Sequence, residues 1–338
     1  MRTMLLAFLV VLGIGLLGVV GSALILTSLV IYYAPPKAQP SPAEFDRIAS
    51  QALGPIEKVR YPSEDGVDLV AWYLPAQVAQ GSEHWGVILT HGGGDNKSTY
   101  LDLAELLRQQ GFDVMLPDLR GHGESARSPN GLTLGITEGR DVAAAANFLV
   151  TAKGVTHIAA HGVSMGGVSA VMAASLDPRI GPLILESSSD QARRVTEMAL
   201  HTIGVPAGAI TSAYARGVTS LLLRRMGAPW SDCLHAILPT RYLAKALSPR
   251  PVLFVFGDRD PLVRASDVAS FAGQFSGATN ICQFKDVAHG VYPARHDEFA
   301  QLILNFLNGW RHMPDSPLQA PVQSGTDFDC SNGNAKPL

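Results

Sequence analysis

The sequence predicts an α/β fold in which helices cover both faces of a mostly parallel sheet. Short apolar runs alternate with longer stretches of helical periodicity through the middle of the 338-residue chain. Strands that are apolar at nearly every position are buried on both faces, as in parallel sheets. Hydrophobic residues make up 47% and charged residues 16%, against about 25% charged in typical soluble proteins, which excludes an intrinsically disordered chain.

The first two expected strands form a hairpin. Residues 57–62 and 67–74 are β-prone, and Asp65-Gly66 between them is a turn signal. The later runs with the composition of buried parallel strands are residues 86–90, 112–117, 157–162, 182–186, 251–257 and 281–284. Helical patterns lie between them, and Asp141 stands in the early turns of one such helix, where the helix dipole favours an acid.

The N-terminus predicts a membrane anchor over residues 1–34. Residues 4–33 carry no charge, and about 20 helical residues are enough to span a hydrocarbon core. A cleaved signal peptide is the alternative, although its apolar region is usually about 7–15 residues long. Arg2 before the run, with Lys37 and Arg47 after it, favours a single-pass protein whose main domain is extracytoplasmic.

Three other segments fall outside the alternation of strands and helices. Residues 35–56 begin with a Pro-rich stretch that predicts a stalk. Residues 190–248 are much longer than an ordinary connection and predict a helical cap over the sheet's carboxyl edge, the alternative being helical packing away from any site. Residues 311–338 lack hydrophobic periodicity and predict a flexible tail. The main domain is therefore expected over residues 57–310.

Charge and cysteine content narrow the classes of function. The net charge of −3 gives no basic footprint for nucleic acid, and no phosphate-binding glycine motif is present in the sequence. The three cysteines, Cys233, Cys282 and Cys330, are too few for a disulfide scaffold and too widely spaced for a zinc site. Neither a nucleic-acid partner nor a metal is expected.

The most informative motif is Gly162–Gly167, whose sequence is GVSMGG, directly after an expected strand. A G-x-S-x-G pattern between a strand and an apolar helix is typical of a nucleophile elbow, a strained turn that lifts the serine hydroxyl clear of the sheet. The glycines are needed where a side chain would clash, and the following helix directs its positive end at the site. Ser164 is the expected nucleophile.

A glycine-rich loop follows an earlier strand at His91–Gly94. Glycines let the backbone approach a ligand closely. A backbone N–H of Gly93, or alternatively of Gly92, would act with that of Met165 to bind an oxyanion that develops on a substrate carbonyl. The alternative is a plain strand-to-helix turn.

Two further side chains complete the set. Asp260 follows the strand at residues 251–257, with Asp258 as the alternative, and a carboxylate here would orient a histidine. His289 is the one histidine of ten that falls in the loop after the last expected strand. The chain order Ser164, Asp260, His289 is the order of a serine, acid and histidine triad on a parallel sheet.

From about residue 57 to residue 310 the chain resembles the serine α/β-hydrolases. The motifs that carry the resemblance are His91–Gly94, Asp118–Ser125, Gly162–Gly167, Gly257–Asp260 and Ala288–Gly290. The resemblance implies an α/β-hydrolase fold and a structural role for the loop at residues 118–125. The family commonly has histidine where this chain has Val163. The N-terminal anchor also resembles membrane-linked members of the superfamily.

The resemblance implies a serine hydrolase that cleaves carboxylic esters, acyl or lipid, through an acyl-enzyme and without a cofactor. Ser164, Asp260 and His289 would be the catalytic triad, with Gly93 and Met165 forming the oxyanion hole. An apolar cap beside a membrane anchor favours an acyl or lipid ester as substrate. A peptidase or thioesterase on the same triad remains an alternative, as does a non-catalytic membrane-bound scaffold on this fold.

Overall fold

The computed structural model describes residues 39–52, 54–78, 83–127, 133, 135–189, 250–275, 277–312 and 328–332, together with Gly18 and Gly21. Apart from those two glycines, all of them belong to one compact unit, Pro36–Gln191 with Thr240–Leu338. The expected anchor over residues 1–34 and cap over residues 190–248 lie outside the described residues, the two glycines excepted. Of the helices that are described, none combines the length and apolar character needed to cross a bilayer.

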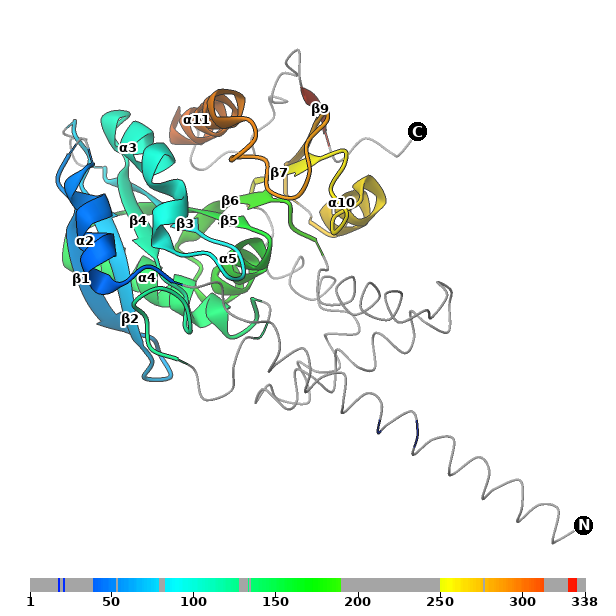
Figure 1. The fold of residues 1–338 in the computed structure, drawn as a ribbon. Coiled ribbons are helices and arrows are strands. Elements are labelled where there is room, and N and C mark those ends of the chain that lie inside the picture. Colours follow the sequence, from blue (N-terminus) through cyan, green and yellow to red (C-terminus); the bar gives the residue numbers. More distant parts are fainter. Residues whose placement is uncertain are drawn as a thin grey trace, which may run out of the picture. The chain divides into compact units, whose positions relative to one another are not determined.

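A single sheet forms the centre of this unit (Figure 1). Its strands are β1 (Glu57–Pro62), β2 (Asp68–Leu74), β3 (Trp85–Thr90), β4 (Asp113–Pro117), β5 (His157–Val163), β6 (Ile180–Glu186), β7 (Val252–Gly257), β8 (Thr279–Phe284) and β9 (Phe328–Asn332). They lie in the order β1-β2-β4-β3-β5-β6-β7-β8-β9. Neighbours from β4 through β8 pair in parallel, while β1–β2, β2–β4 and β8–β9 are antiparallel. The prediction of a mostly parallel sheet is confirmed.

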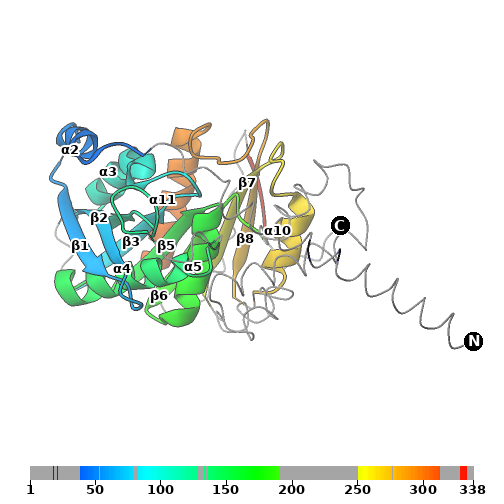
Figure 2. The same ribbon diagram turned by 60° about the horizontal axis from the view of Figure 1, so that its bottom comes forward.

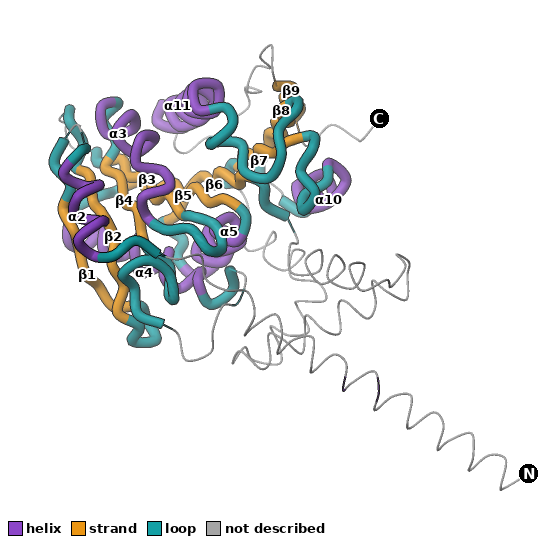
Figure 3. The backbone as a smooth tube through the Cα atoms, in the orientation of Figure 1, coloured by secondary structure: helices purple, strands orange, loops and turns teal. Residues whose placement is uncertain are grey.

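Helices cover both faces of the sheet (Figure 3). One face carries α4 (Glu138–Lys153), α5 (Met165–Leu176) and α10 (Ala265–Ala272), and the other carries α2 (Pro42–Ser50), α3 (Leu101–Gln109) and α11 (His296–His312). Figure 2 shows α2 and α3 on one side of the sheet and α4 and α5 on the other. A short 3₁₀ helix, η1 (Lys97–Tyr100), precedes α3.

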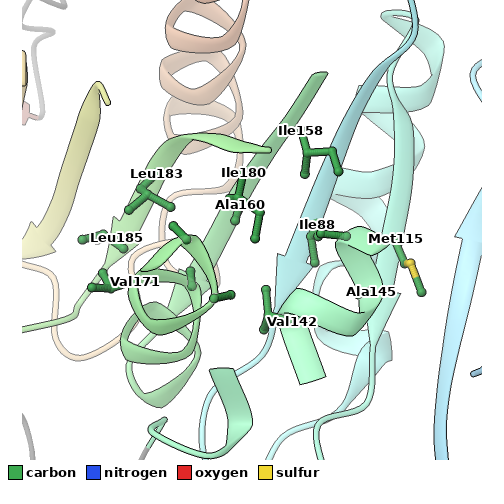
Figure 4. Close-up of a cluster of buried hydrophobic side chains, with 14 of the residues drawn as sticks. Ile88, Met115, Val142, Ala145, Ile158, Ala160, Val171, Ile180, Leu183 and Leu185 are labelled. Atoms are coloured by element: carbon green, nitrogen blue, oxygen red, sulfur yellow. The ribbon is translucent and has the colours of Figure 1, made fainter. Parts of the chain in front are cut away.

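Two hydrophobic clusters correspond to the two faces. On β5, Ile158 and Ala160 belong to the cluster beneath α4 and α5, while Ala159 between them belongs to the opposite cluster. This is the alternation that a pleated strand imposes on consecutive side chains. Figure 4 shows Val142 of α4 and Val171 of α5 in the first cluster. Because apolar side chains fill both faces, polar chemistry is left to the ends of the strands.

Two elements lie where the sequence predicted no regular structure. Helix α2 falls within the expected stalk, where Ser41 caps it by accepting the Glu44 N–H at 3.3 Å, and Phe45 is fully buried. Strand β9 falls within the expected tail and is bonded to β8 by the Cys282–Cys330 disulfide. The segment expected to be a flexible tail therefore contains a paired strand at residues 328–332. This strand is held by its pairing with an edge strand and by a disulfide, and hydrophobic periodicity in the sequence predicts neither of these interactions.

Candidate active site

The carboxyl ends of the six parallel strands, β4, β3, β5, β6, β7 and β8, lie along one edge of the sheet. The register sets Thr90 at the end of β3 beside Gly162 of β5, and Val163 beside Glu186 at the end of β6. Strands β7 and β8 continue the row. Each candidate side chain or backbone donor follows one of these ends, so the sheet gathers segments that are far apart in sequence.

Ser164 lies at the sharp turn between β5 and α5. Its backbone has φ 56° and ψ −120°, a conformation that L-residues rarely adopt. A Cβ at Gly162 would lie 2.1 Å from the Gly166 carbonyl oxygen, and one at Gly166 would lie 2.5 Å from that of His91. The flanking glycines are therefore required, as expected from the motif. Backbone strain of this kind is found at functional sites, where the surroundings enforce it.

Asp260 and His289 are brought together by the ends of β7 and β8. The His289 Nδ1 lies 3.0 Å from Asp260 Oδ1 and 2.9 Å from Oδ2. Asp260 Oδ1 also accepts the N–H groups of Leu262, at 2.8 Å, and Val263, at 3.0 Å, so the carboxylate is fixed. An ionised carboxylate only accepts hydrogen bonds, so the ring proton is on Nδ1. The lone pair on Nε2 can then accept a proton during a reaction. Asp258, the alternative acid, is exposed.

The end of β6 is bonded to both the serine and the histidine segments. The Ser164 N–H donates to the Glu186 carbonyl at 2.9 Å, and Ser188 Oγ donates to the Ser164 carbonyl at 3.1 Å. On the other side, the Gly290 N–H donates to Ser187 Oγ at 3.1 Å. The loop that carries His289 therefore reaches past β7 to the same strand end that holds Ser164.

The glycine-rich loop after β3 lies against the serine. A Cβ built at Gly92 would be 3.5 Å from Ser164 Cβ, and one built at Gly93 would be 3.8 Å from Met165 Sδ. Met165 is the first residue of α5, and the first N–H groups of a helix have no carbonyl partner inside it. The loop and the helix start are thus neighbours, as an oxyanion hole requires. The assignment of Gly93 and Met165 as the two donors stays a prediction.

Two histidines, His91 and His122, hold this loop in place, and no motif in the sequence indicated their hydrogen-bond partners. His91 Nε2 accepts the Leu119 N–H at 3.1 Å, and His122 Nε2 accepts the Gly94 N–H at 3.1 Å. A ring nitrogen that accepts must be unprotonated, so both imidazoles act in the neutral form. Burial, and next the neighbouring His122, lower the pKa of His91 to about 3. The loop at residues 118–125 therefore supports the glycine-rich loop.

A buried cluster of charged side chains, Lys97, Asp118 and Glu124, links the segment after the glycine-rich loop to the loop at residues 118–125. Lys97 is fully buried, with Nζ 2.5 Å from Asp118 Oδ2 and 2.9 Å from Glu124 Oε2. Phe45 of α2 lies beneath the ammonium, 3.4 Å from Nζ to the ring centroid. Burial raises the pKa of Asp118, and Lys97 opposes that rise. At Gly123, with φ 49°, a Cβ would collide with the Asp118 carboxylate.

Residues 87–302 match the sequence model of the alpha/beta hydrolase family. The chain belongs to this family. It is also 29% identical to the Escherichia coli K12 protein YfhR over 75 residues, which are 22% of this chain and 26% of that protein. The matched stretch thus spans about a quarter of that relative.

Solved structures share the fold of this alpha/beta hydrolase. An esterase of Pyrococcus furiosus is 20% identical with a TM-score of 0.59, covering 82% of this chain and 98% of its own. The alpha/beta hydrolase GrgF of a Penicillium species is 20% identical with a TM-score of 0.54, covering 77% and 100%. A membrane phospholipase A, a bacterial virulence factor, is 17% identical with a TM-score of 0.54, covering 92% and 99%. At these identities the likeness is one of fold.

Proposed function

We propose that this alpha/beta hydrolase is a serine esterase in which Ser164 is the nucleophile, His289 the general base and Asp260 the group that orients His289. The observation that carries the proposal is the Asp260–His289 pair, with bonds of 2.9 and 3.0 Å, at the same sheet edge as a serine held at positive φ. A serine hydroxyl is a weak nucleophile unless an adjacent base activates it.

The proposed reaction has two halves. His289 Nε2 takes the proton from Ser164 Oγ as Oγ attacks the ester carbonyl carbon, and the N–H groups of Gly93 and Met165 hold the oxyanion. The tetrahedral intermediate collapses, the carbon–oxygen bond to the alcohol breaks, and the imidazolium gives its proton to the leaving oxygen. Water then attacks the acyl-enzyme with His289 again as base, which releases the acid and restores Ser164.

The position of the imidazole suits this role. The His289 side chain is 26% exposed, whereas the Asp260 side chain is fully buried. A buried carboxylate keeps its charge close to the imidazolium that forms during the reaction, where little water screens it. The exposed part of the ring leaves a substrate access to it, so the pair combines a shielded orienting group with an open base.

We also propose that the substrate is an acyl or lipid ester. The support is the apolar N-terminal run and the apolar segment at residues 190–248 in the sequence, with structural neighbours named as an esterase and a membrane phospholipase A. A panel of matched acyl esters, thioesters and aminoacyl amides tests this choice. Faster turnover of the amide or thioester than of the oxygen ester would redirect the proposal to a peptidase or a thioesterase.

We also propose that the protein crosses the membrane once and that its catalytic domain is extracytoplasmic. Its support is the Cys282–Cys330 disulfide, because cytosolic thiols are kept reduced while disulfides persist in oxidising compartments. Protease added to intact spheroplasts that express the full chain should digest the domain. Protection until the membrane is permeabilised would place the domain inside.

The decisive test of the function uses an activated acyl ester and a fluorophosphonate probe that labels activated serines. The wild-type chain is expected to hydrolyse the ester and to be labelled, and Ser164→Ala to lose both. Ser175→Ala is the matched control, since its hydroxyl bonds the Met172 carbonyl within α5, away from the elbow. Labelling or turnover that survives Ser164→Ala would overturn the proposal, and so would an unreactive wild type.

A further inference from the structure

Glu186, the last residue of β6, is a fully buried carboxylate that the proposed reaction does not use. Its Oε1 accepts the N–H groups of Val291, at 2.6 Å, and Tyr292, at 2.8 Å. These two residues come directly after His289 and Gly290 in the chain. The carboxylate therefore binds the backbone of the segment that carries the proposed general base.

The same residue holds the serine through its backbone. The Ser164 N–H donates to the Glu186 carbonyl oxygen at 2.9 Å. Glu186 is thus bonded by its main chain to the nucleophile and by its side chain to the segment that follows His289.

The second carboxylate oxygen of Glu186, Oε2, also accepts two hydrogen bonds. Oε2 accepts from the Tyr100 hydroxyl at 2.7 Å and from His161 Nε2 at 3.0 Å. Phe299 of α11 packs on the His161 ring, with centroids 5.8 Å apart. A carboxylate buried away from water is costly unless hydrogen bonds satisfy it, and here it has four donors. The side chain is therefore locked in one position before any substrate binds.

The backbone near His289 explains why such a clamp matters. Gly290, which separates His289 from the residues that Glu186 binds, has φ 85°, a conformation that favours glycine, and its N–H donates to Ser187 Oγ at 3.1 Å. The Asp260 bond fixes the orientation of the ring at Nδ1 but leaves the position of its backbone to other contacts. A displacement of about 1 Å at a reacting group can cost about 100-fold in rate.

We propose that Glu186 is a positioning residue that sets His289 at its working distance from Ser164, and this rests on the esterase function proposed above. The carboxylate fixes the backbone after His289, and the carbonyl of the same residue fixes the backbone of Ser164. The backbone of Ser164 and the backbone that follows His289 are thereby both bonded to the same residue. The role differs from that of Asp260, which contacts the imidazole itself.

The test is a double-mutant cycle on hydrolysis of an activated aryl ester by the full chain. Glu186→Gln keeps the shape but replaces the charged acceptor, and is expected to lower kcat about tenfold with KM within about threefold. Glu186→Ala, which removes the clamp, is expected to lower kcat about 100-fold. In the His289→Ala background the Gln substitution should change the residual rate by less than about twofold, because the residue acts through His289.

The matched control is Asp113→Asn. Asp113 is also a buried carboxylate that accepts a tyrosine hydroxyl, from Tyr73 at 2.7 Å, and a backbone N–H, from Ala76 at 3.0 Å. It stands at the start of β4, the opposite edge of the sheet from the site. Its substitution should lower thermal stability and leave kcat of the folded enzyme within about twofold, since it does not touch the histidine segment.

Each outcome decides a different statement. An unchanged kcat in Glu186→Gln, or an equal loss in the wild-type and His289→Ala backgrounds, overturns the positioning role. If Glu186→Ala yields too little folded protein, the cycle on Glu186→Gln decides alone. Wild-type activity in His289→Ala overturns the proposed function and this inference with it, whereas loss in His289→Ala with no effect of Glu186→Gln overturns the inference only.

Discussion

His289 Nδ1 lies 2.9 Å from Asp260 Oδ2, and the Asp260 side chain has no exposed surface. The two residues are 29 positions apart in the chain and belong to loops after different strands. The carboxylate is further bonded to two backbone N–H groups of its own turn, at Leu262 and Val263, so it cannot follow the ring if the ring moves. The acid is therefore a fixed support, and the histidine takes its orientation from it.

Asp260→Asn should leave the fold intact and lower kcat by about 10³–10⁴-fold. The asparagine amide can donate to Nδ1, which favours the tautomer with the proton on Nε2 and removes the lone pair that would accept the serine proton. Hydrolysis of an activated ester by the folded variant measures the effect. Asp258→Asn is the control, because Asp258 is exposed, and it should retain activity within about twofold. The reverse result would identify Asp258 as the acid.

His122→Phe should lower kcat about tenfold with KM within about threefold, because it keeps the ring but removes the acceptor for the Gly94 N–H. His122→Gln restores an oxygen acceptor near the Nε2 position and should recover most of the rate. Steady-state kinetics on an acyl ester measures both. Equal losses in the two variants would show that ring packing against His91, at 4.9 Å between centroids, is what matters.

The fully buried His91 should make stability fall as the pH drops. Its pKa is lowered to about 3, from 6.5 when unfolded, so between those values the unfolded chain binds a proton that the folded chain does not. Stability from this group is complete above pH 6.5 and is lost towards pH 3. His91→Gln should lower the slope of unfolding free energy against pH by about 1.4 kcal/mol per pH unit in that window. Urea titrations at several pH values measure it, and parallel curves for the two proteins would contradict it.

Lys97→Met should destabilise the domain by about 3–5 kcal/mol, because it leaves the Asp118 carboxylate buried without its cation and removes one of the two lysines that pair with Glu124. Lys58→Met is the matched control. Lys58 pairs with Glu124 at 3.2 Å but its side chain is 29% exposed, so its loss should cost less than about 1 kcal/mol. Urea denaturation compares the two variants. Similar losses would show that burial of the lysine adds little to the strength of this cluster.

Local pattern was sufficient for much of the fold. Strand β1 spans residues 57–62 as predicted, and the Asp65-Gly66 turn forms with Gly66 at φ 81°. The elbow at Ser164 follows from the glycines around it, since the clash that excludes other residues is a short-range effect. Apolar runs and turn residues act within a few positions, so a single sequence carries their signal.

Contacts between side chains that are far apart in the sequence could not be predicted from local pattern. Asp141 stands in the first turn of α4, as expected, but its side chain also lies 2.6 Å from that of Arg120, and both side chains are buried. Burial raises the pKa of Asp141 to about 6, although the hydrogen bond from Arg120 opposes the rise. The Cys282–Cys330 bond likewise joins residues whose spacing showed no pattern. Which polar groups meet depends on the register of the strands, and no local rule encodes that.

The sequence by itself determined the alternation of strands and helices within the main domain, the alpha/beta class, and the candidates Ser164, Asp260 and His289. Only the tertiary structure decided that Asp260 rather than Asp258 faces the histidine, that His122 supports the glycine loop, and that Glu186 joins the segments of Ser164 and His289. The physical reason is the distance along the chain over which each kind of interaction acts. Periodicity and steric strain operate between neighbours in the chain, whereas hydrogen bonds among buried groups form only after the parallel strands have brought their carboxyl ends to one edge.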